Sequence, residues 1–130
     1  MNISIAGIAV KNGKIFIARR VEGGDMGGKW EFPGGKAESG ESCEESLVRE
    51  FFEEFGVKIT PDKLLGESSF THKGIKRILY AYKIYLDDEY LNLTEHTEWK
   101  WASLEEIKNL DFIPSDLSLI PFIEPVLADS

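Results

Sequence analysis

The sequence predicts an α/β (α+β) fold, in which helices pack on a mixed β-sheet. Two apolar, β-branched segments near the N-terminus are joined by a hairpin signal, which predicts paired strands. A helix with capping residues at both ends follows, and further strands and a second capped helix complete the chain. Because 130 residues suffice for one core and are too few for two, we expect a single domain over residues 1–130.

The first two strands are expected over residues 3–10 and 15–20, where both segments are apolar and rich in β-branched residues. Asn12-Gly13 between them is a dipeptide typical of a tight hairpin turn. Residues 21–29 then form a glycine-rich loop. A loop of this composition is expected to be mobile or functional.

The central helix is expected to begin at Ser42 and to end at Gly56. Ser42 followed by Glu45 predicts a capping box, and Gly56 stands where a left-handed residue would end the helix. Apolar residues at helical spacing between these caps predict a buried stripe, made of Leu47, Phe51 and Phe55 together with Val48 and Phe52.

Four further elements and a terminal segment follow the central helix. In chain order we expect strands over residues 64–71 and 75–86 joined by a turn at 72–74, a strand over 99–102, and a short helix with a capping box of Ser103 and Glu106. The last segment, residues 115–127, is helical in character at its start. Pro121 and Pro125 require that this helix begin late or kink.

The composition excludes several classes of protein. A hydrophobic fraction of 42% and a charged fraction of 29% are those of a globular protein, and no apolar run is long enough to span a bilayer. The N-terminus lacks the features of a signal peptide, and a single cysteine, Cys43, precludes an internal disulfide, so we expect a cytoplasmic protein. A net charge of -8 argues against a polymeric nucleic acid as partner, because its phosphates would be repelled.

Three glutamates on the central helix predict a metal site. Glu50, Glu53 and Glu54 occupy positions i, i+3 and i+4, which places their carboxylates on one face, opposite the apolar stripe. Like charges at this spacing repel one another, and Mg²⁺ would compensate them because it binds carboxylate and carbonyl oxygens and keeps waters that phosphate can replace. The alternative for such a helix is a solvated acidic face.

The residues around these glutamates have a family spacing. Gly35 is followed after five residues by Glu41, and after seven more by Arg49 to Val57, which read Arg-Glu-Phe-Phe-Glu-Glu-Phe-Gly-Val. This segment resembles the complete Nudix box, and it favours the metal site over the solvated face. The segment of residues 29–36 is similar to the stretch before the box in MutT-like and CTP-preferring pyrophosphohydrolases. The resemblance extends from Ile5 to about Ile120 and implies the Nudix fold, a mixed sheet sandwiched between helices.

The resemblance also implies the metal ligands. They are the carboxylates of Glu50, Glu53 and Glu54 and the backbone carbonyl of Gly34, with Mg²⁺, or alternatively Mn²⁺, as the cation. Glu95 corresponds to an outlying glutamate of the family that serves as a further ligand or general base, and Glu98 would replace it if the loop is shifted. Taken by itself, Glu95 would be an ordinary surface glutamate of a polar loop, and the resemblance favours the functional role.

The implied reaction is in-line attack of a water on a phosphorus atom, without a covalent enzyme intermediate. Arg49 is expected to orient the helix carboxylates by ion pairs, and Glu41 to support it in the same way. The general base is Glu53, Glu50 or Glu95, and the residue pattern leaves this open. In MutT-like members the products are a nucleoside monophosphate and pyrophosphate.

Three residues are candidates for nucleotide binding. Arg20 corresponds to a MutT-like arginine that reaches the nucleotide, whereas Arg19 should face the other side of its strand. Phe32 either packs on a base or belongs to the core. Asp116 stands where MutT-like members have a base-reading asparagine, and a carboxylate there would accept from an exocyclic amine, as on cytosine. Its alternative role is to stabilise a helix N-terminus.

The leading hypothesis is therefore a MutT-like pyrophosphohydrolase of oxidised or CTP-like nucleoside triphosphates. The alternatives are a Nudix hydrolase of another diphosphate, such as a nucleotide sugar or dinucleoside polyphosphate, and a non-catalytic nucleotide-binding module. The expected partner is a small nucleotide, without nucleic acid or membrane, and the protein is a monomer or a homodimer. His72 and His96 have no metal-ligand spacing and are predicted to be surface residues.

Overall fold

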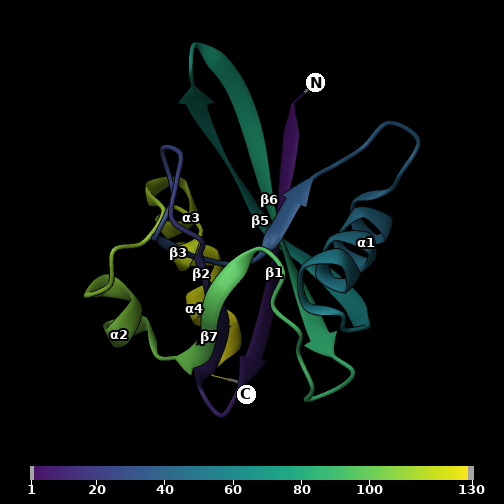
Figure 1. Cartoon of the computed structure of the whole chain (residues 1–130), viewed down its shortest axis with the longest axis vertical. Coiled ribbons are helices and arrows are strands. Elements are labelled where there is room, and N and C mark those ends of the chain that lie inside the picture. Colours follow the sequence, from purple (N-terminus) through teal and green to yellow (C-terminus); the bar gives the residue numbers. More distant parts are fainter. Residues whose placement is uncertain (1, 129–130) are drawn as a thin grey trace.

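The computed structural model describes residues 2–128 (Figure 1). The described chain contains strands and helices in the order β1 (Ile3–Lys11), β2 (Lys14–Arg20), β3 (Trp30–Glu31), β4 (Gly34–Lys36), α1 (Cys43–Phe55), β5 (Ile59–His72), β6 (Ile75–Leu86), β7 (His96–Ala102), α2 (Leu104–Lys108), α3 (Pro114–Leu117) and α4 (Ile120–Leu127). None of these helices is long and apolar enough to cross a membrane.

The strands form a mixed sheet, as predicted. The order of the main path is β3-β2-β1-β6-β5, while β4 pairs with β1 and β7 pairs with β2. The β1–β6 pair is parallel, and the other strand pairs are antiparallel. Most of β1 pairs with β4 and β6, whereas its last two residues, Val10 and Lys11, pair with β2. The strand β1 therefore connects two parts of the sheet that diverge from it.

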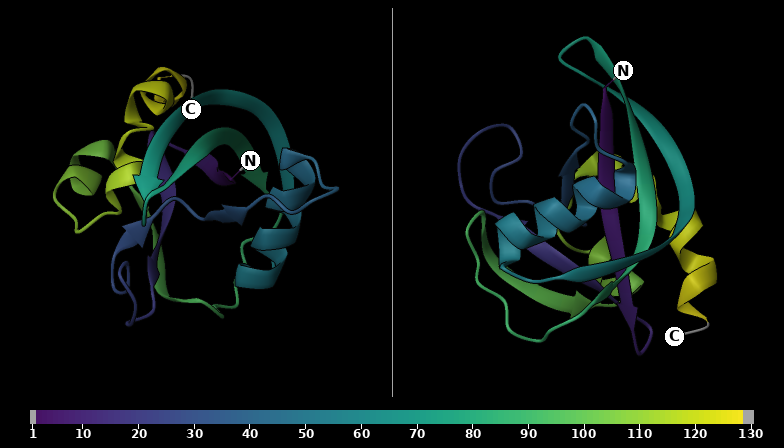
Figure 2. Two further views of the ribbon diagram at one scale, coloured as in Figure 1. Left: turned by 90° about the horizontal axis from the view of Figure 1, so that it is seen from above. Right: turned by 90° about the vertical axis from the view of Figure 1, so that its right-hand side faces the viewer.

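Helices cover both sides of the sheet, which confirms the predicted layers. Figures 1 and 2 show α1 on one side of the strands and α2, α3 and α4 on the other. The core beneath α1 includes Phe16, Phe51 and Phe55, and the core on the opposite side includes Leu119 and Ile123. Burial of these apolar side chains on both faces is the main favourable contribution to folding.

The caps of α1 agree with the prediction, whereas two members of its apolar stripe do not. Ser42 and Glu45 form both hydrogen bonds of a capping box, and Gly56 ends the helix in the left-handed conformation at φ 65°. Val48 and Phe52, however, are 38% and 57% exposed. Each follows a buried residue by one position, a rotation of about 100° that turns its side chain away from the sheet. The buried stripe is therefore narrower than predicted.

Several boundaries also differ from the prediction. The strand β5 begins at Ile59 instead of Leu64, and its early part contains irregular pairing near Pro61 and Gly66. Proline and glycine are depleted in regular strands, and both are tolerated at such irregularities. The strand β7 begins at His96, three residues before the expected start.

The C-terminal segment forms two helices, α3 and α4, and α3 starts at Pro114, one residue before the expected helix. Pro121 stands in the first turn of α4, where a proline needs no hydrogen-bond donor. The segment thus accommodates its prolines by a break before α4, and Pro125 lies within that helix.

Candidate active site

The three glutamates of α1 that are expected to bind metal differ strongly in exposure. The side chains of Glu50 and Glu53 are 18% and 58% exposed, whereas that of Glu54 is 4% exposed. The prediction that all three lie opposite the apolar stripe is therefore wrong for Glu54, which is buried like its neighbour Phe55. At 100° per residue, Glu54 falls beside Leu47 on the inner edge of the helix. The carboxylates thus extend from the surface into the core.

Arg49 holds this acidic face together. Its guanidinium donates from Nε and Nη2 to both carboxylate oxygens of Glu41, at 2.9 and 3.0 Å. Nη1 also donates to Glu50 at 2.7 Å and to Glu53 at 3.4 Å. The hydrogen bond from Arg49 lowers the pKa of Glu41, and its partner Glu41 raises the pKa of Arg49. One arginine is therefore shared among several carboxylates, and Glu54 receives no contact from it in the described structure.

Glu54 fits a ligand of a divalent cation. Burial raises the pKa of this carboxyl to about 10, with further contributions from Glu50, Glu31 and Glu95. Its Oε2 is buried and lacks a hydrogen-bond partner among the described residues. A buried carboxyl surrounded by other carboxyls is unfavourable unless a cation compensates it. This oxygen and its acidic neighbours match the oxygen donors that Mg²⁺ or Mn²⁺ binds.

The glycines that open the box allow close contact between β4 and α1. A Cβ atom on Gly35 would lie 2.4 Å from the carboxyl carbon of Glu50. Any side chain at this position would therefore force β4 away from α1. Gly34, the expected carbonyl ligand, precedes it in β4 and pairs with Ala6 of β1. The backbone of β4 is thereby placed directly beside the carboxylates.

A cleft of about 300 Å³ lies beside this strand. Gly34 and Gly35 form part of its wall, and the described cations that line it are Arg20, Lys36 and Arg77 together with the half-buried His72. A larger cavity of about 520 Å³ lies on the far part of β1 and is lined by Val10, Trp99 and Trp101 among others. A third cavity of about 430 Å³ lies against the outer face of α1 and is lined by Arg49 and Glu53 among others. Of these three cavities, the smallest has the glycines of the box in its wall, and its cations suit a phosphate chain. It is the candidate nucleotide site.

The three predicted nucleotide-binding residues all line this cleft. Nη1 of Arg20 lies 3.2 Å from Oε1 of Glu31, whereas Arg19 contacts Gly28 and Glu98 outside the cleft. The ring of Phe32 is buried against Phe112 at 4.9 Å, which favours the core role over stacking on a base.

Asp116 lies buried at the start of α3. Its Oδ2 accepts a hydrogen bond from the backbone N–H of Phe32 at 2.9 Å. Burial, and then the charge of Glu31, raise the pKa of Asp116 to about 8, although the Phe32 N–H and Arg20 oppose this shift. The raised pKa favours the neutral acid form of this side chain, which can donate as well as accept.

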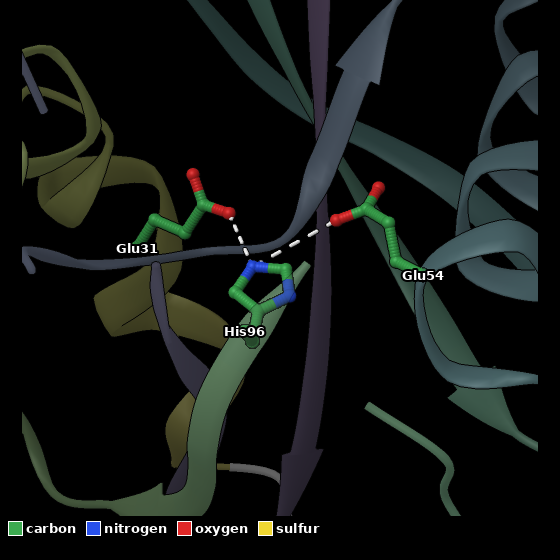
Figure 3. Close-up of side chains that lie close together, drawn as sticks. All are labelled: Glu31, Glu54 and His96. Carbon is green, nitrogen blue, oxygen red and sulfur yellow. Dashed lines mark hydrogen bonds and ion pairs between the residues drawn. The ribbon is translucent and has the colours of Figure 1, made fainter. Parts of the chain in front are cut away.

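The site has two halves, the carboxylates of α1 and the cationic cleft, and a buried histidine lies between them. Figure 3 shows His96 of β7 between Glu31 of β3 and Glu54 of α1. Its Nε2 lies 2.7 Å from Glu31 and 3.8 Å from Glu54. His96 is 5% exposed, so its prediction as a surface residue is wrong, and His72 is likewise part of the cleft wall. Neither position could be inferred from sequence spacing, because the partners come from distant segments.

The two candidates for the outlying glutamate lie at different places relative to β7. Glu98 lies within the strand and pairs with Arg19 at 3.4 Å. Glu95 is exposed just before the strand, and its charge contributes to the raised pKa of Glu54. The arrangement favours Glu95 as the residue that faces the helix carboxylates.

A mixed sheet between helices, with a carboxylate-rich helix beside a cationic cleft, defines a class of small α/β enzymes that act on phosphate compounds with a divalent cation. The NUDIX domain model matches residues 1–122. This chain therefore belongs to the Nudix family.

Known proteins with related sequences or structures agree with this assignment. The chain is 34% identical over 126 residues to the CTP pyrophosphohydrolase of Escherichia coli, covering 95% of this chain and 90% of that protein. It is 31% identical over 113 residues to the 8-oxo-dGTP diphosphatase of Buchnera aphidicola, covering 83% and 82% of the two chains. The solution structure of the E. coli ORF135 protein superposes with a TM-score of 0.84 at 32% identity, covering 99% and 92%. The predicted Nudix fold and hydrolase family are confirmed.

Proposed function

We propose that this protein is a Mg²⁺-dependent nucleoside triphosphate pyrophosphohydrolase that releases a nucleoside monophosphate and pyrophosphate. The observation that carries the proposal is the contact between the two halves of the site. The carboxylates of α1 adjoin, through Gly34 and Gly35, a cleft lined by cations. A polyphosphate in this cleft would reach the carboxylates through the bound metal, which resolves how a protein of net charge -8 can bind a polyanion.

Each residue has a role that its environment supports. Glu50, Glu53, Glu54 and the Gly34 carbonyl would hold the cation, with Glu95 as a further ligand or base, and Mn²⁺ would bind the same oxygens. When bound, the cation would neutralise phosphate charge and lower the pKa of an attacking water. Glu53 is the most exposed of the three α1 glutamates, which makes it our choice of general base, with Glu50 and Glu95 as alternatives. Arg49 would keep the carboxylates in place.

The base would be read near Asp116 and Arg20. The names of two relatives, a CTP pyrophosphohydrolase and an 8-oxo-dGTP diphosphatase, support a CTP-like or an oxidised nucleotide as substrate. The neutral acid form of Asp116 would donate and accept on adjacent atoms, so we extend the expected ligand from an amine donor to a base edge with a donor and an acceptor.

Pyrophosphate release from a nucleotide panel with Mg²⁺ tests the proposal. We expect turnover of a nucleoside triphosphate, and Glu53→Gln, which keeps the size of the side chain and removes its charge, should be at least about 100-fold slower. Absence of turnover for every triphosphate and diphosphate would refute the proposal that the protein is an enzyme. ADP-ribose as sole substrate would refute the proposed preference for triphosphates.

The alternatives have less support. Hydrolysis of a nucleotide sugar or dinucleoside polyphosphate would use the same carboxylates, and the panel distinguishes it. A non-catalytic binding module would not need the full set of box glutamates that this chain retains. A cytoplasmic location, a monomer or homodimer, and the absence of a nucleic acid or membrane partner remain our predictions from composition.

A further inference from the structure

We propose that His96 is a positioning residue that fixes Glu31 of the cleft and Glu54 of α1 relative to each other. This inference rests on the proposed function, and it concerns a residue that has no part in the reaction chemistry itself. It follows from three observations on the position of the imidazole.

The first observation is the set of contacts that the ring makes. Nε2 of His96 lies 2.7 Å from Oε2 of Glu31 and 3.8 Å from Oε1 of Glu54. The second oxygen of Glu31 accepts from Arg20, which lines the cleft. Within residues 2–128, His96 is thus in contact with the carboxylates on both sides of the site. Its loss would leave Glu31 with Arg20 alone.

The second observation is that the ring is held rigidly. The imidazole stacks on Phe55 with the ring centres 5.0 Å apart and the planes at 13°, so α1 fixes its orientation. The side chain is 1% exposed. A carboxylate accepts hydrogen bonds, so Nε2 is the nitrogen that donates to Glu31, and Nδ1 has no hydrogen-bond partner among the described residues. The stacking on Phe55 therefore points Nε2 toward Glu31, while Nδ1 makes no hydrogen bond to another described group.

The third observation is an irregular pairing between β2 and β7 that turns the side chain of His96 toward Glu31 and Glu54. Arg19 pairs with Glu98, but Arg20 pairs with His96, so Thr97 is the extra residue of a β-bulge. Thr97 and Glu98 are consecutive exposed residues, which breaks the alternation of a regular strand. In a regular register, Thr97 would face Arg20. The bulge therefore places the imidazole where it contacts both Glu31 and Glu54.

The same three side chains also form a group whose ligand atoms lie within 4.8 Å of one another, a spacing that could hold a metal. We favour the positioning role because the 2.7 Å contact already satisfies Nε2 and Glu31. A metal with a nitrogen ligand is the competing outcome of the test below.

The test compares His96→Leu, His96→Gln and the matched control Trp99→Leu. Gln can present an N–H near the position of Nε2, whereas Leu cannot. Trp99 lies in the same strand, packs on Phe16 and lines the distant cavity, so its loss weakens β7 without touching Glu31 or Glu54. Four quantities are measured for each folded variant: KM and kcat for the best nucleotide, the Kd of Mn²⁺ by electron paramagnetic resonance, and Tm.

We expect His96→Leu to raise KM and the Kd of Mn²⁺ by about 10-fold or more, and His96→Gln to recover most of both losses. The control should lower Tm with KM and the Kd of Mn²⁺ unchanged. The proposal is overturned if His96→Leu changes Tm alone, if Gln gives no recovery, or if bound Mn²⁺ shows nitrogen hyperfine coupling that His96→Leu removes. Because Mn²⁺ binding needs no turnover, an inactive wild type would refute the proposed function and still leave this result interpretable.

Discussion

The two halves of the site balance charge in opposite ways. On α1 and its flanking loop, Arg49 is shared among four carboxylates, and the buried Oε2 of Glu54 has no hydrogen-bond partner among the described residues. In the cleft the excess is positive, since Arg20, Lys36 and Arg77 line a wall whose acids, Glu31 and Asp116, are largely buried. The first region requires a cation and the second an anion. Under the proposed function, a metal-bound polyphosphate would supply both.

The largest effect is expected when the buried carboxylate of Glu54 in α1 is neutralised. Glu54→Gln should lower kcat by at least about 100-fold if Glu54 is a metal ligand, as we propose. Without metal the same variant should have a higher Tm than the wild type, since a neutral amide replaces a buried carboxyl whose pKa is raised to about 10. Thermal unfolding in EDTA measures this, with the exposed Glu53→Gln as control. A lower Tm for Glu54→Gln would contradict our account of the helix.

Metal addition should have the next largest effect. At a Mg²⁺ concentration about 100 times its Kd, binding to the folded state alone adds about 2.7 kcal/mol to the free energy of unfolding. Denaturant unfolding with Mg²⁺ or EDTA measures the difference. The gain should be much smaller in Glu54→Gln, and an equal gain in that variant would show that the stabilising cation binds elsewhere.

A smaller effect is expected in the cleft. Burial raises the pKa of Asp116 to about 8 from 3.8, so its contribution to stability is lost as pH rises from about 4 to 8. Asp116→Asn, which imitates the neutral acid, should therefore show a weaker decline of Tm over this range. Its preference among nucleotide bases should also be constant between pH 7 and 9, whereas that of the wild type should change by about tenfold. Parallel pH profiles of the two proteins would remove Asp116 from the base site.

The smallest effect tests the outer surface of α1. Phe52→Ser should change the free energy of unfolding by less than about 0.5 kcal/mol, because the ring is 57% exposed. Phe51→Ala, one residue earlier and fully buried, should cost about 3–5 kcal/mol. Urea unfolding of both variants measures the contrast, and similar losses would mean that Phe52 is covered.

Helix α1 could be predicted because its information is local. The caps, the glutamates and the glycines lie within one continuous segment, and helical spacing determines which side chains are neighbours. The errors in this region concern orientation. Glu54, Val48 and Phe52 were assigned to the wrong faces because the helix period alone does not reveal how far the sheet extends around α1.

The cleft could be predicted only in part because its walls come from segments far apart in the chain. Arg20 and Asp116 were found through resemblance, whereas Arg77 carries no local signal of its position. His96 depends on a bulge opposite Arg20, and a one-residue change of register is invisible in a polar segment. A useful signal was the Glu-Phe pair before Pro33, since an acid in an otherwise apolar strand often has a buried partner.

The position of β1 also sets the order in which the molecule can fold. Ala6 of β1 pairs in parallel with Ala81 of β6, 75 positions later, and α1 lies between these strands in the chain. Parallel pairs between distant segments form slowly because a long loop must close first. During synthesis, α1 therefore emerges with its carboxylates before either β6 or His96 is available. We expect that its acidic residues remain hydrated at this stage and that Glu54 enters the core only when β1 and β6 meet.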